Sequence, residues 1–196
     1  MTFKNLLSIA LLSGLLALAG CKNAAEPPAA AAPAVAVSIP AIAAEAKGFT
    51  VGSPMSVRTV YVFFDPQCPH CAALWKEAKP LKSQAKFVWI PVGLLNAASG
   101  PQGAALLAAA DPVAAMDAHE ASMSAKTGGI TATGNLDAQR AVVESNTKLM
   151  NRFQFGSVPT VVAKHASTGD LVVKEGSMQT AVLAAVLGLQ PPATGQ

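Results

Sequence analysis

The sequence predicts one α/β domain whose elements follow the order β-α-β, a helical insertion, then β-β-α. Three observations lead to this class. Short apolar runs rich in β-branched residues are typical of buried strands, the stretches between them carry helix-start signals, and the last two strands follow one another across a turn. The chain has 196 residues, which is enough for one domain with a sizeable core.

The first strand and the first helix flank the sequence DPQCPHC. Residues 58–64 (RTVYVFF) lack the period-2 alternation of a half-exposed strand, which indicates a strand covered on both faces. The dipeptide at 65–66 (DP) ends this strand. A helix is expected to begin near Cys68, with Pro69 in the first turn, where its missing N–H costs nothing. This helix meets Pro80, which must kink or end it.

A second strand and the helical insertion come next. Residues 87–92 (FVWIPV) form another apolar run, and a largely helical stretch follows it. Asp111 is a suitable N-cap and Pro112 a first-turn residue, so a helix is predicted over 113–125. A further helix is predicted over 137–152, where the apolar residues recur at helical spacing.

The C-terminal part completes the domain. Two short strands are predicted over 160–164 and 171–174 around a Thr-Gly-Asp turn. The last helix is expected to be capped by Ser177 and to end at Gly188. Ordered structure is expected to begin near Phe49.

The N-terminus carries an export signal. A short basic region precedes the apolar run at 6–19, which is shorter than the roughly 20 residues of a spanning helix and ends in small residues like a signal peptide. Its end, LALAGC, resembles the lipobox of bacterial lipoproteins, which implies cleavage before Cys21 and lipid on that cysteine. Lys22 favours the outer membrane. An ordinary signal peptide and an uncleaved anchor are the alternatives.

These assignments divide the chain into four parts. Residues 1–20 are the expected signal peptide, and 21–48 the lipid site with an Ala/Pro-rich, semi-rigid tether. A short helix at 41–47 is compatible with this. Residues 49–189 form the predicted domain, and 190–196 a disordered tail. The formal charge of +3 and the absence of a basic run argue against a nucleic-acid partner.

The three cysteines of the chain narrow the function. With lipid on Cys21, only Cys68 and Cys71 remain as thiols, in a compartment where disulfides persist. A bridge that encloses two residues removes little loop entropy, so it stabilises the fold poorly. A metal site would need further ligands, and neither a second CxxC nor an obvious distal Cys/His pair is present. Redox chemistry is therefore the favoured reading, with no metal and no cofactor.

Two motifs in the expected order resemble the thioredoxin fold. A CxxC follows a buried strand and opens a helix, and Val158-Pro159 precedes the third core strand, where that fold has a cis-proline. The sequence thus predicts a thioredoxin-like α/β fold with a helical insertion between the second and third core strands.

Within that fold the chain resembles the bacterial Dsb proteins. Pro69-His70 is the dipeptide of the oxidase DsbA, whereas the longer resemblance is to the DsbG and DsbC branch. The segments that carry it are DPQCPHC, Trp75, Pro80, DPVAAMDAHEAS and ESNTKLMNRFQFGSVPT. Val62 stands where thioredoxins and DsbA have a buried acid, and Val158 where DsbG and DsbC have Thr. The tether cannot build their dimerisation domain, so a monomer is expected.

The resemblance implies roles for the site residues. Cys68, at a helix N-terminus, is expected to be the nucleophilic thiolate, because unsatisfied N–H groups and the helix dipole favour the anion. His70 adds a donor that can carry positive charge. Cys71 is the expected resolving thiol. Pro69 fixes the turn and has no N–H to compete.

Substrate contacts are expected at the proline loop. The backbone of Val158 can pair with an extended substrate segment, and cis-Pro159 keeps metals from the cysteines. The resemblance implies exported proteins with cysteines as substrates, a DsbB-like or DsbD-like membrane redox partner, and a periplasmic location. Three functions stay open: a disulfide donor, a reductant that repairs wrong disulfides or sulfenic acids, and a binding or chaperone module without redox turnover.

Four other residues are predicted to have mainly structural roles. His119 and His165 are expected to be solvated or hydrogen-bonded. Asp65 reads as a strand-end or cap residue, with a proton-transfer role left open by its nearness to the cysteines. Trp75 reads as a core or site-flanking residue, with substrate contact as the alternative.

Overall fold

The structure, a computed structural model of the chain, describes residues 35–192. Cys21, the expected signal peptide and residues 193–196 lie outside this part. The described elements are α1 (Ile39–Glu45), β1 (Phe49–Gly52), β2 (Thr59–Phe64), α2 (Pro69–Ala78), η1 (Lys79–Leu81), β3 (Lys86–Pro91), α3 (Ser99–Ala108), α4 (Pro112–Ser124), α5 (Asp137–Arg152), β4 (Thr160–Lys164), β5 (Leu171–Glu175) and α6 (Thr180–Leu187). None of these helices is long and apolar enough to cross a membrane.

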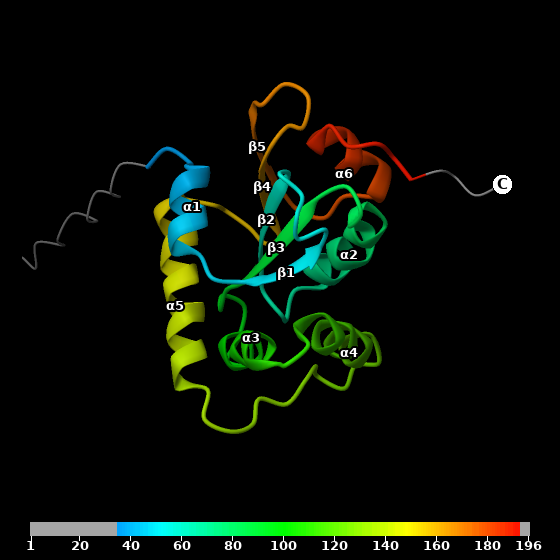
Figure 1. Cartoon of the computed structure of the whole chain (residues 1–196). Coiled ribbons are helices and arrows are strands. Elements are labelled where there is room, and N and C mark those ends of the chain that lie inside the picture. Colours follow the sequence, from blue (N-terminus) through cyan, green and yellow to red (C-terminus); the bar gives the residue numbers. More distant parts are fainter. Residues whose placement is uncertain (1–34, 193–196) are drawn as a thin grey trace, which may run out of the picture. The chain divides into compact units, whose positions relative to one another are not determined.

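The strands form one mixed sheet in the order β1-β3-β2-β4-β5 (Figure 1). β2 and β3 are parallel, and every other neighbouring pair is antiparallel. In β2, Val62, Phe63 and Phe64 are all buried, because both faces of the sheet are covered. This confirms the strand predicted from the lack of alternation at 58–64.

Helices cover the two faces of the sheet. α2 and α6 pack on one face, where Trp75 and Trp89 meet edge to face with ring centroids 4.9 Å apart. α1 and α5 pack on the other face, around Phe63 and Phe155. Trp75 is 1% exposed and belongs to the core, as one of its two readings predicted. These layers match the predicted thioredoxin-like arrangement.

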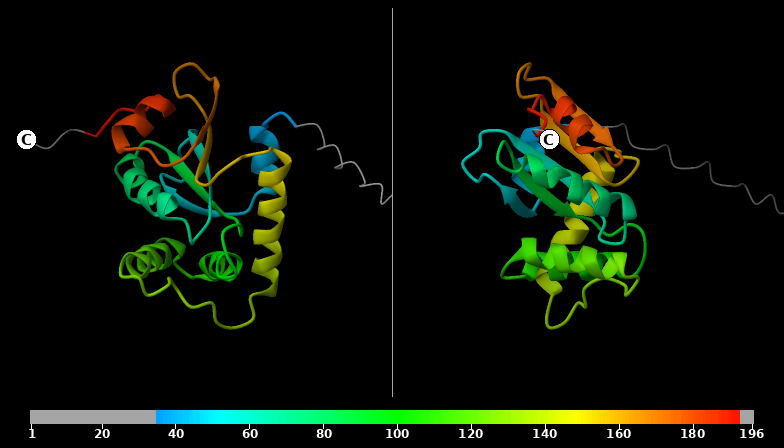
Figure 2. Two further views of the ribbon diagram at one scale, coloured as in Figure 1. Left: turned by 180° about the vertical axis from the view of Figure 1, so that it is seen from behind. Right: turned by 90° about the vertical axis from the view of Figure 1, so that its right-hand side faces the viewer.

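The helical insertion consists of α3 and α4 (Figure 2). Both lie at the end of the sheet where β2 leads into α2 (Figures 1 and 2). Asp111 caps α4 as predicted, since its Oδ1 accepts hydrogen bonds from the N–H groups of Val113 and Ala114. The insertion therefore supplies a wall beside the CxxC helix.

The sequence predicted that the folded part starts near Phe49, but in the structure it starts earlier, with α1. α1 occupies residues assigned to the tether, and its Ile42 is fully buried against α5. Residues 49–52 form an edge strand that the sequence analysis did not identify as a strand. The apolar residues of α1 are spread among alanines, so their periodicity gave a weak helix signal in the sequence.

Asn146 of α5 holds the segment between α1 and β1 in place. Its side chain accepts a hydrogen bond from the N–H of Lys47 (3.0 Å) and donates to the carbonyl oxygens of Lys47 (2.8 Å) and Pro91 (3.0 Å). The side chain is 1% exposed. Asn146 therefore satisfies backbone groups that would otherwise be buried without partners.

We expect Asn146→Ala to lower the free energy of unfolding by roughly 2–4 kcal/mol, because several buried backbone groups lose their partner at once. Ser145→Ala, at an exposed position on the same helix, is the matched control and should change stability by less than about 0.5 kcal/mol. Urea unfolding followed by circular dichroism measures both. Equal effects in the two variants would contradict the role assigned to Asn146.

Two details at the C-terminus correct the sequence analysis. Ser177 does not cap α6: the N-cap is Gln179, and the N–H of Thr180 donates to Glu77 Oε2 at 2.7 Å. A cap from another helix leaves no local sequence signal. Gly188 ends α6 with φ of 67°, as predicted. Gln190, expected in the disordered tail, exchanges two hydrogen bonds with Gln84.

Candidate redox site

The CxxC pair lies at the start of α2. Cys68 is the N-cap residue with an extended backbone, and Pro69 occupies the first helical position, as the sequence predicted. The N–H of Cys71 donates to the carbonyl oxygen of Cys68 at 3.0 Å. Cys68 is 6% exposed and Cys71 fully buried, and both are free thiols in this structure. Only the first cysteine can therefore be reached by a partner.

The surroundings of Cys68 favour its thiolate. The thiol of Cys71 donates a hydrogen bond to the Cys68 sulfur, which is the largest influence on its pKa. Burial acts in the opposite direction, while the N–H groups of Cys71 and His70 and the charge of His70 add smaller stabilising contributions. Together they lower the pKa of Cys68 to about 6. At neutral pH this sulfur is mostly an anion.

Cys71 has the opposite character. Burial raises the pKa of the Cys71 thiol, and the neighbouring Cys68 raises it further. Cys71 therefore keeps its proton in the reduced protein and can donate it in the hydrogen bond to Cys68. The two thiols differ in exposure and ionisation, as a nucleophilic and a resolving thiol must.

The proline loop faces the first cysteine. The peptide bond between Val158 and Pro159 is cis. Cys68 Sγ lies 3.5 Å from the carbonyl oxygen of Val158, to which the protonated thiol donates. Glu175 of β5 holds this loop by accepting hydrogen bonds from the N–H of Gly156 (2.8 Å) and the hydroxyl of Ser157 (3.0 Å). The fold thus joins two predicted site segments that are 90 residues apart in sequence.

His70 is placed differently from the cysteines. Its side chain is exposed, and Nδ1 lies 3.5 Å from the hydroxyl of Ser177, in the loop before α6. Its charge contributes to the lowered pKa of Cys68 as the smallest of the causes named above. The backbone of the helix start therefore contributes more to the thiolate than the imidazole does.

Asp65 is fully buried in the turn between β2 and α2. Its Oδ1 accepts a hydrogen bond from the N–H of Gln67 (2.8 Å), and its Oδ2 accepts from the N–H groups of Leu94 (2.7 Å) and Leu95 (3.0 Å). Asp65 therefore holds the turn before Cys68 to the loop that follows β3. This is the strand-end role among its two predicted readings.

His119 of α4 is buried and hydrogen-bonded. Its Nε2 lies 2.7 Å from the carbonyl oxygen of Pro66, and its Nδ1 accepts from the N–H of Ile130 at 3.2 Å. Burial lowers the pKa of His119, so the ring is neutral at pH 7 and donates through Nε2. The expectation of a hydrogen-bonded residue is correct, and the alternative of a solvated residue is wrong.

Glu120 of α4 is a further residue near Cys68, which no sequence pattern indicated. This residue is 4% exposed and lines a cavity of about 380 Å³ that also contains Cys68. Burial raises its pKa to about 7. Only its position next to His119 in DPVAAMDAHEAS could have drawn attention to it, and a glutamate in a helix is otherwise typical of an exposed face. Across residues 35–192, no cluster of three or more His, Cys, Asp or Glu residues could hold a metal ion.

Sequence comparison relates the chain to disulfide-exchange proteins. It is 32% identical over 134 residues to the thiol:disulfide interchange protein DsbG of Pseudomonas aeruginosa, covering 67% of this chain and 51% of that protein. It is 30% identical over 125 residues to the protein of the same name from Escherichia coli, covering 63% and 47% respectively. The chain thus spans about half the length of the curated relatives it matches.

Solved structures show the same fold at low sequence identity. The catalytic domain of Proteus mirabilis ScsC aligns with a TM-score of 0.58 at 16% identity, over 76% of this chain and 96% of that one. A periplasmic thioredoxin-like protein from Salmonella enterica aligns with a TM-score of 0.60 at 15% identity, over 79% and 97%. Residues 54–190 match the thioredoxin-like domain family. The chain therefore belongs to the thioredoxin-like domain family.

Proposed function

We propose that the chain is a thiol–disulfide oxidoreductase that exchanges the Cys68–Cys71 disulfide or dithiol with cysteines of exported proteins. The observation that carries this proposal is the asymmetry of the pair: an accessible sulfur with a pKa of about 6 next to a buried thiol with a raised pKa. The two DsbG relatives carry the name thiol:disulfide interchange protein, which supports the same activity.

The geometry supports a two-step exchange. In the reducing direction the Cys68 thiolate attacks one sulfur of a substrate disulfide, the substrate S–S bond breaks, and one substrate sulfur leaves as a thiolate. Cys71 then loses its proton and attacks Cys68 Sγ, which breaks the mixed disulfide and releases the second substrate sulfur. The substrate gains two electrons and the Cys68–Cys71 pair loses two. The oxidising direction is the reverse of these steps.

Two features bear on direction and docking. A stabilised Cys68 thiolate favours the reduced protein, so the disulfide form should act as an oxidant, less strongly than DsbA with its pKa near 3.5. The carbonyl of Val158, close to Cys68, is placed to accept a hydrogen bond from an extended substrate segment. The first inference rests on the ionisation of Cys68, and the second rests on the position of the proline loop.

We further propose that the domain works in the periplasm, tethered to a membrane through lipid on Cys21, with the outer membrane favoured. The leader-like start and the LALAGC sequence support this. A membrane redox partner would then restore the cysteine pair after each cycle. The expectation of a monomer stays a prediction, which light scattering can test.

Trapping of substrates tests the function. In a Cys71→Ala variant the first step still occurs, but the mixed disulfide cannot be resolved, so covalent complexes with exported proteins should accumulate. Non-reducing electrophoresis and mass spectrometry detect them, with Cys68→Ala/Cys71→Ala as the control that should form none. Absence of complexes with Cys71→Ala, or equal amounts in the control, would contradict the exchange reaction.

The same experiment tests the anchor. Complexes trapped by Cys71→Ala should sediment with membranes. In Cys21→Ser/Cys71→Ala they should instead move to the soluble fraction. Sedimentation that does not change after the replacement of Cys21 would contradict the lipid site and leave the exchange reaction standing.

A further inference from the structure

A cavity of about 380 Å³ opens beside the nucleophilic cysteine, between α2 and α4. Its lining includes Cys68, Pro69, Ala72, Lys76, Glu77 and Glu120. Most of its wall is apolar, and the space is large enough for a side chain of a substrate. Cys68 and Glu120 both line it, so a group bound there contacts both residues.

The carboxyl group of Glu120 has a free hydrogen-bonding position. Glu120 is 4% exposed, and its Oε2 is buried without a hydrogen-bond partner. Among residues 35–192 it is the one buried side-chain oxygen or nitrogen atom in this condition. Burying an unpaired acceptor is unfavourable, so such a group in a native structure calls for an explanation, of which a catalytic role is one.

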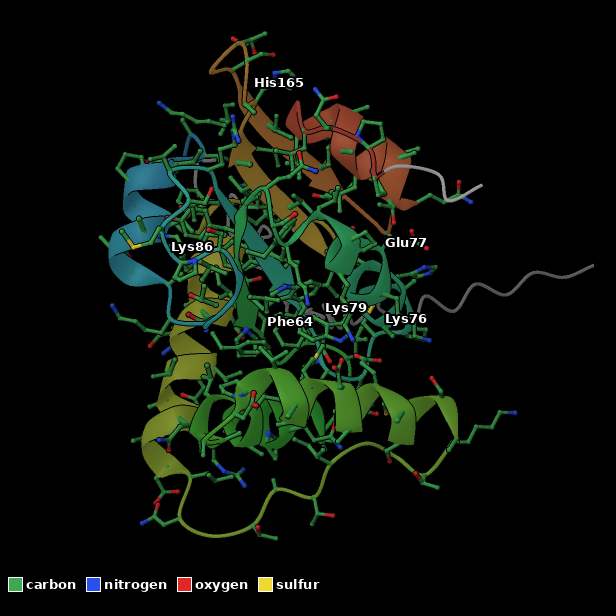
Figure 3. All side chains as sticks on the ribbon, turned by 45° about the vertical axis from the view of Figure 1, so that its right-hand side comes forward. Phe64, Lys76, Glu77, Lys79, Lys86 and His165 are labelled. Atoms are coloured by element: carbon green, nitrogen blue, oxygen red, sulfur yellow. The ribbon has the colours of Figure 1, made fainter. Side chains whose placement is uncertain are left out.

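Charged groups around Glu120 come from both helices. Burial raises the pKa of the carboxyl group most, Lys76 of α2 lowers it, and Cys68 and Asp117 raise it. Figure 3 shows Lys76 and Lys79 on the side of α2 toward α4, and Glu77 on the side toward α6. Asp117 accepts hydrogen bonds from Trp75 and Lys79, and Glu77 accepts from Thr180. These hydrogen bonds occupy a carboxylate oxygen of Asp117 and of Glu77, although Glu77 also lines the cavity.

Burial has the largest influence and raises the pKa of Glu120 to about 7. At neutral pH the group is therefore present in both its acid and its base form. This is the condition under which a side chain transfers protons most efficiently in both directions.

Two other buried titratable groups near Cys68 are less suited to this task. Asp65 is occupied by three backbone N–H groups. Both ring nitrogens of His119 are hydrogen-bonded. Val62 supplies no acid beneath the cysteines. Glu120 is buried, its Oε2 has no hydrogen-bond partner, and it lines the same cavity as Cys68.

We propose that Glu120 is the acid–base group for the substrate sulfur during exchange at Cys68. When the Cys68 thiolate attacks a substrate disulfide, the S–S bond breaks and the protonated carboxyl group gives its proton to the leaving substrate thiolate. In the reverse direction the carboxylate takes the proton from the second substrate thiol, whose sulfur then attacks the substrate sulfur of the mixed disulfide and releases Cys68 as the thiolate. This inference rests on the proposed exchange function.

A comparison of two leaving groups tests the role of Glu120. With reduced Glu120→Gln, the rate constant for glutathione disulfide should fall roughly tenfold, because the alkyl thiolate that leaves is basic and needs a proton. For an aromatic disulfide, whose thiolate is stable without a proton, the change should be less than about twofold. Glu144→Gln, at an exposed position of α5, is the matched control and should change neither rate.

The pH profile gives a second readout. For the wild-type chain, the rate with glutathione disulfide should rise near pH 6 as Cys68 ionises and fall above about pH 7 as Glu120 loses its proton. Glu120→Gln should keep the rising limb and lose the falling limb. The wild-type profile does not depend on the variant folding, and a wild-type rate that stays level above pH 7 would overturn the proposal.

Two further outcomes would overturn it. Equal losses with both disulfides would mean that Glu120 acts on Cys68 or on the fold, and no loss with either would mean that it takes no part. Alkylation of Cys68 by iodoacetamide needs no proton donor, so it checks that the variant site is intact. Failure of the proposed function is distinguishable, because the wild-type chain would then not react with either disulfide while still being alkylated.

Discussion

Cys68→Ser is expected to lower the rate of thiol–disulfide exchange by roughly 10³-fold or more. The variant removes the accessible sulfur, and no other described side chain can replace it, since Cys71 is fully buried and its pKa is raised by that burial. A serine hydroxyl is nearly isosteric but far less nucleophilic. The measurement is the rate of oxidation of the reduced protein by glutathione disulfide.

The Cys71→Ser variant is the matched control for this result. It should still react with glutathione disulfide in a single step and then remain as the mixed disulfide at Cys68. Thermal unfolding of both variants checks that the fold is retained. Substantial exchange by Cys68→Ser, with Cys71 carrying the glutathione, would reverse the roles assigned to the two cysteines.

The second large effect is a pH-dependent stability of the reduced protein. The pKa of Cys68 is about 6 in the folded chain, below the value of about 8.5 for a free thiol. The folded state therefore holds the thiolate where the unfolded state holds the thiol. This contribution is complete above about pH 8.5 and is lost as the pH falls through 6. A shift of this size corresponds to at most about 3 kcal/mol, reduced by solvent screening.

Urea unfolding of the reduced wild-type chain and of Cys68→Ser measures this contribution. Relative to the variant, the wild-type chain should gain roughly 2 kcal/mol between pH 5 and pH 8.5. The comparison cancels titrating groups that both chains share. Stability curves that run parallel over this range would show that the folded chain does not stabilise the Cys68 thiolate.

Much of the sheet could be predicted from the sequence because its strands are apolar on both faces. The runs at 58–64, 87–92 and 160–164 correspond to β2, β3 and β4, and α5 begins and ends as predicted. The cis bond before Pro159 was expected from the thioredoxin resemblance. Local patterns and turn chemistry determine these features, so one sequence is sufficient to find them.

The features that the sequence did not predict depend on contacts between distant segments. A short helix at 41–47 was compatible with the sequence, but the packing of α1 depends on the burial of Ile42 against α5 and on Asn146, which is 99 residues from Lys47. The cap of α6 comes from Glu77, 103 residues from Thr180. Glu120 of α4 is buried at the cavity that α4 forms with α2. No local pattern records these contacts.

Some residues of the candidate site could likewise be placed from the sequence, and others could not. Cys68, Pro69 and Cys71 could be placed from the CxxC and the predicted helix start, and Val158 from the proline motif. His70 makes only a small contribution to the lowered pKa of Cys68. The sequence could not predict this, because the contribution depends on where the imidazole lies relative to the helix start. Such positions are set by side-chain directions in the folded chain.

The most direct test of the account is the ionisation of Cys68, measured as thiolate absorbance at roughly 240 nm against pH. The reduced chain should be used with Cys21→Ser, so that no third thiol contributes. A single transition near pH 6 is predicted, and it should be absent when Cys68 is also replaced by serine. A transition near the free-thiol value of about 8.5, or one that persists without Cys68, would contradict the account.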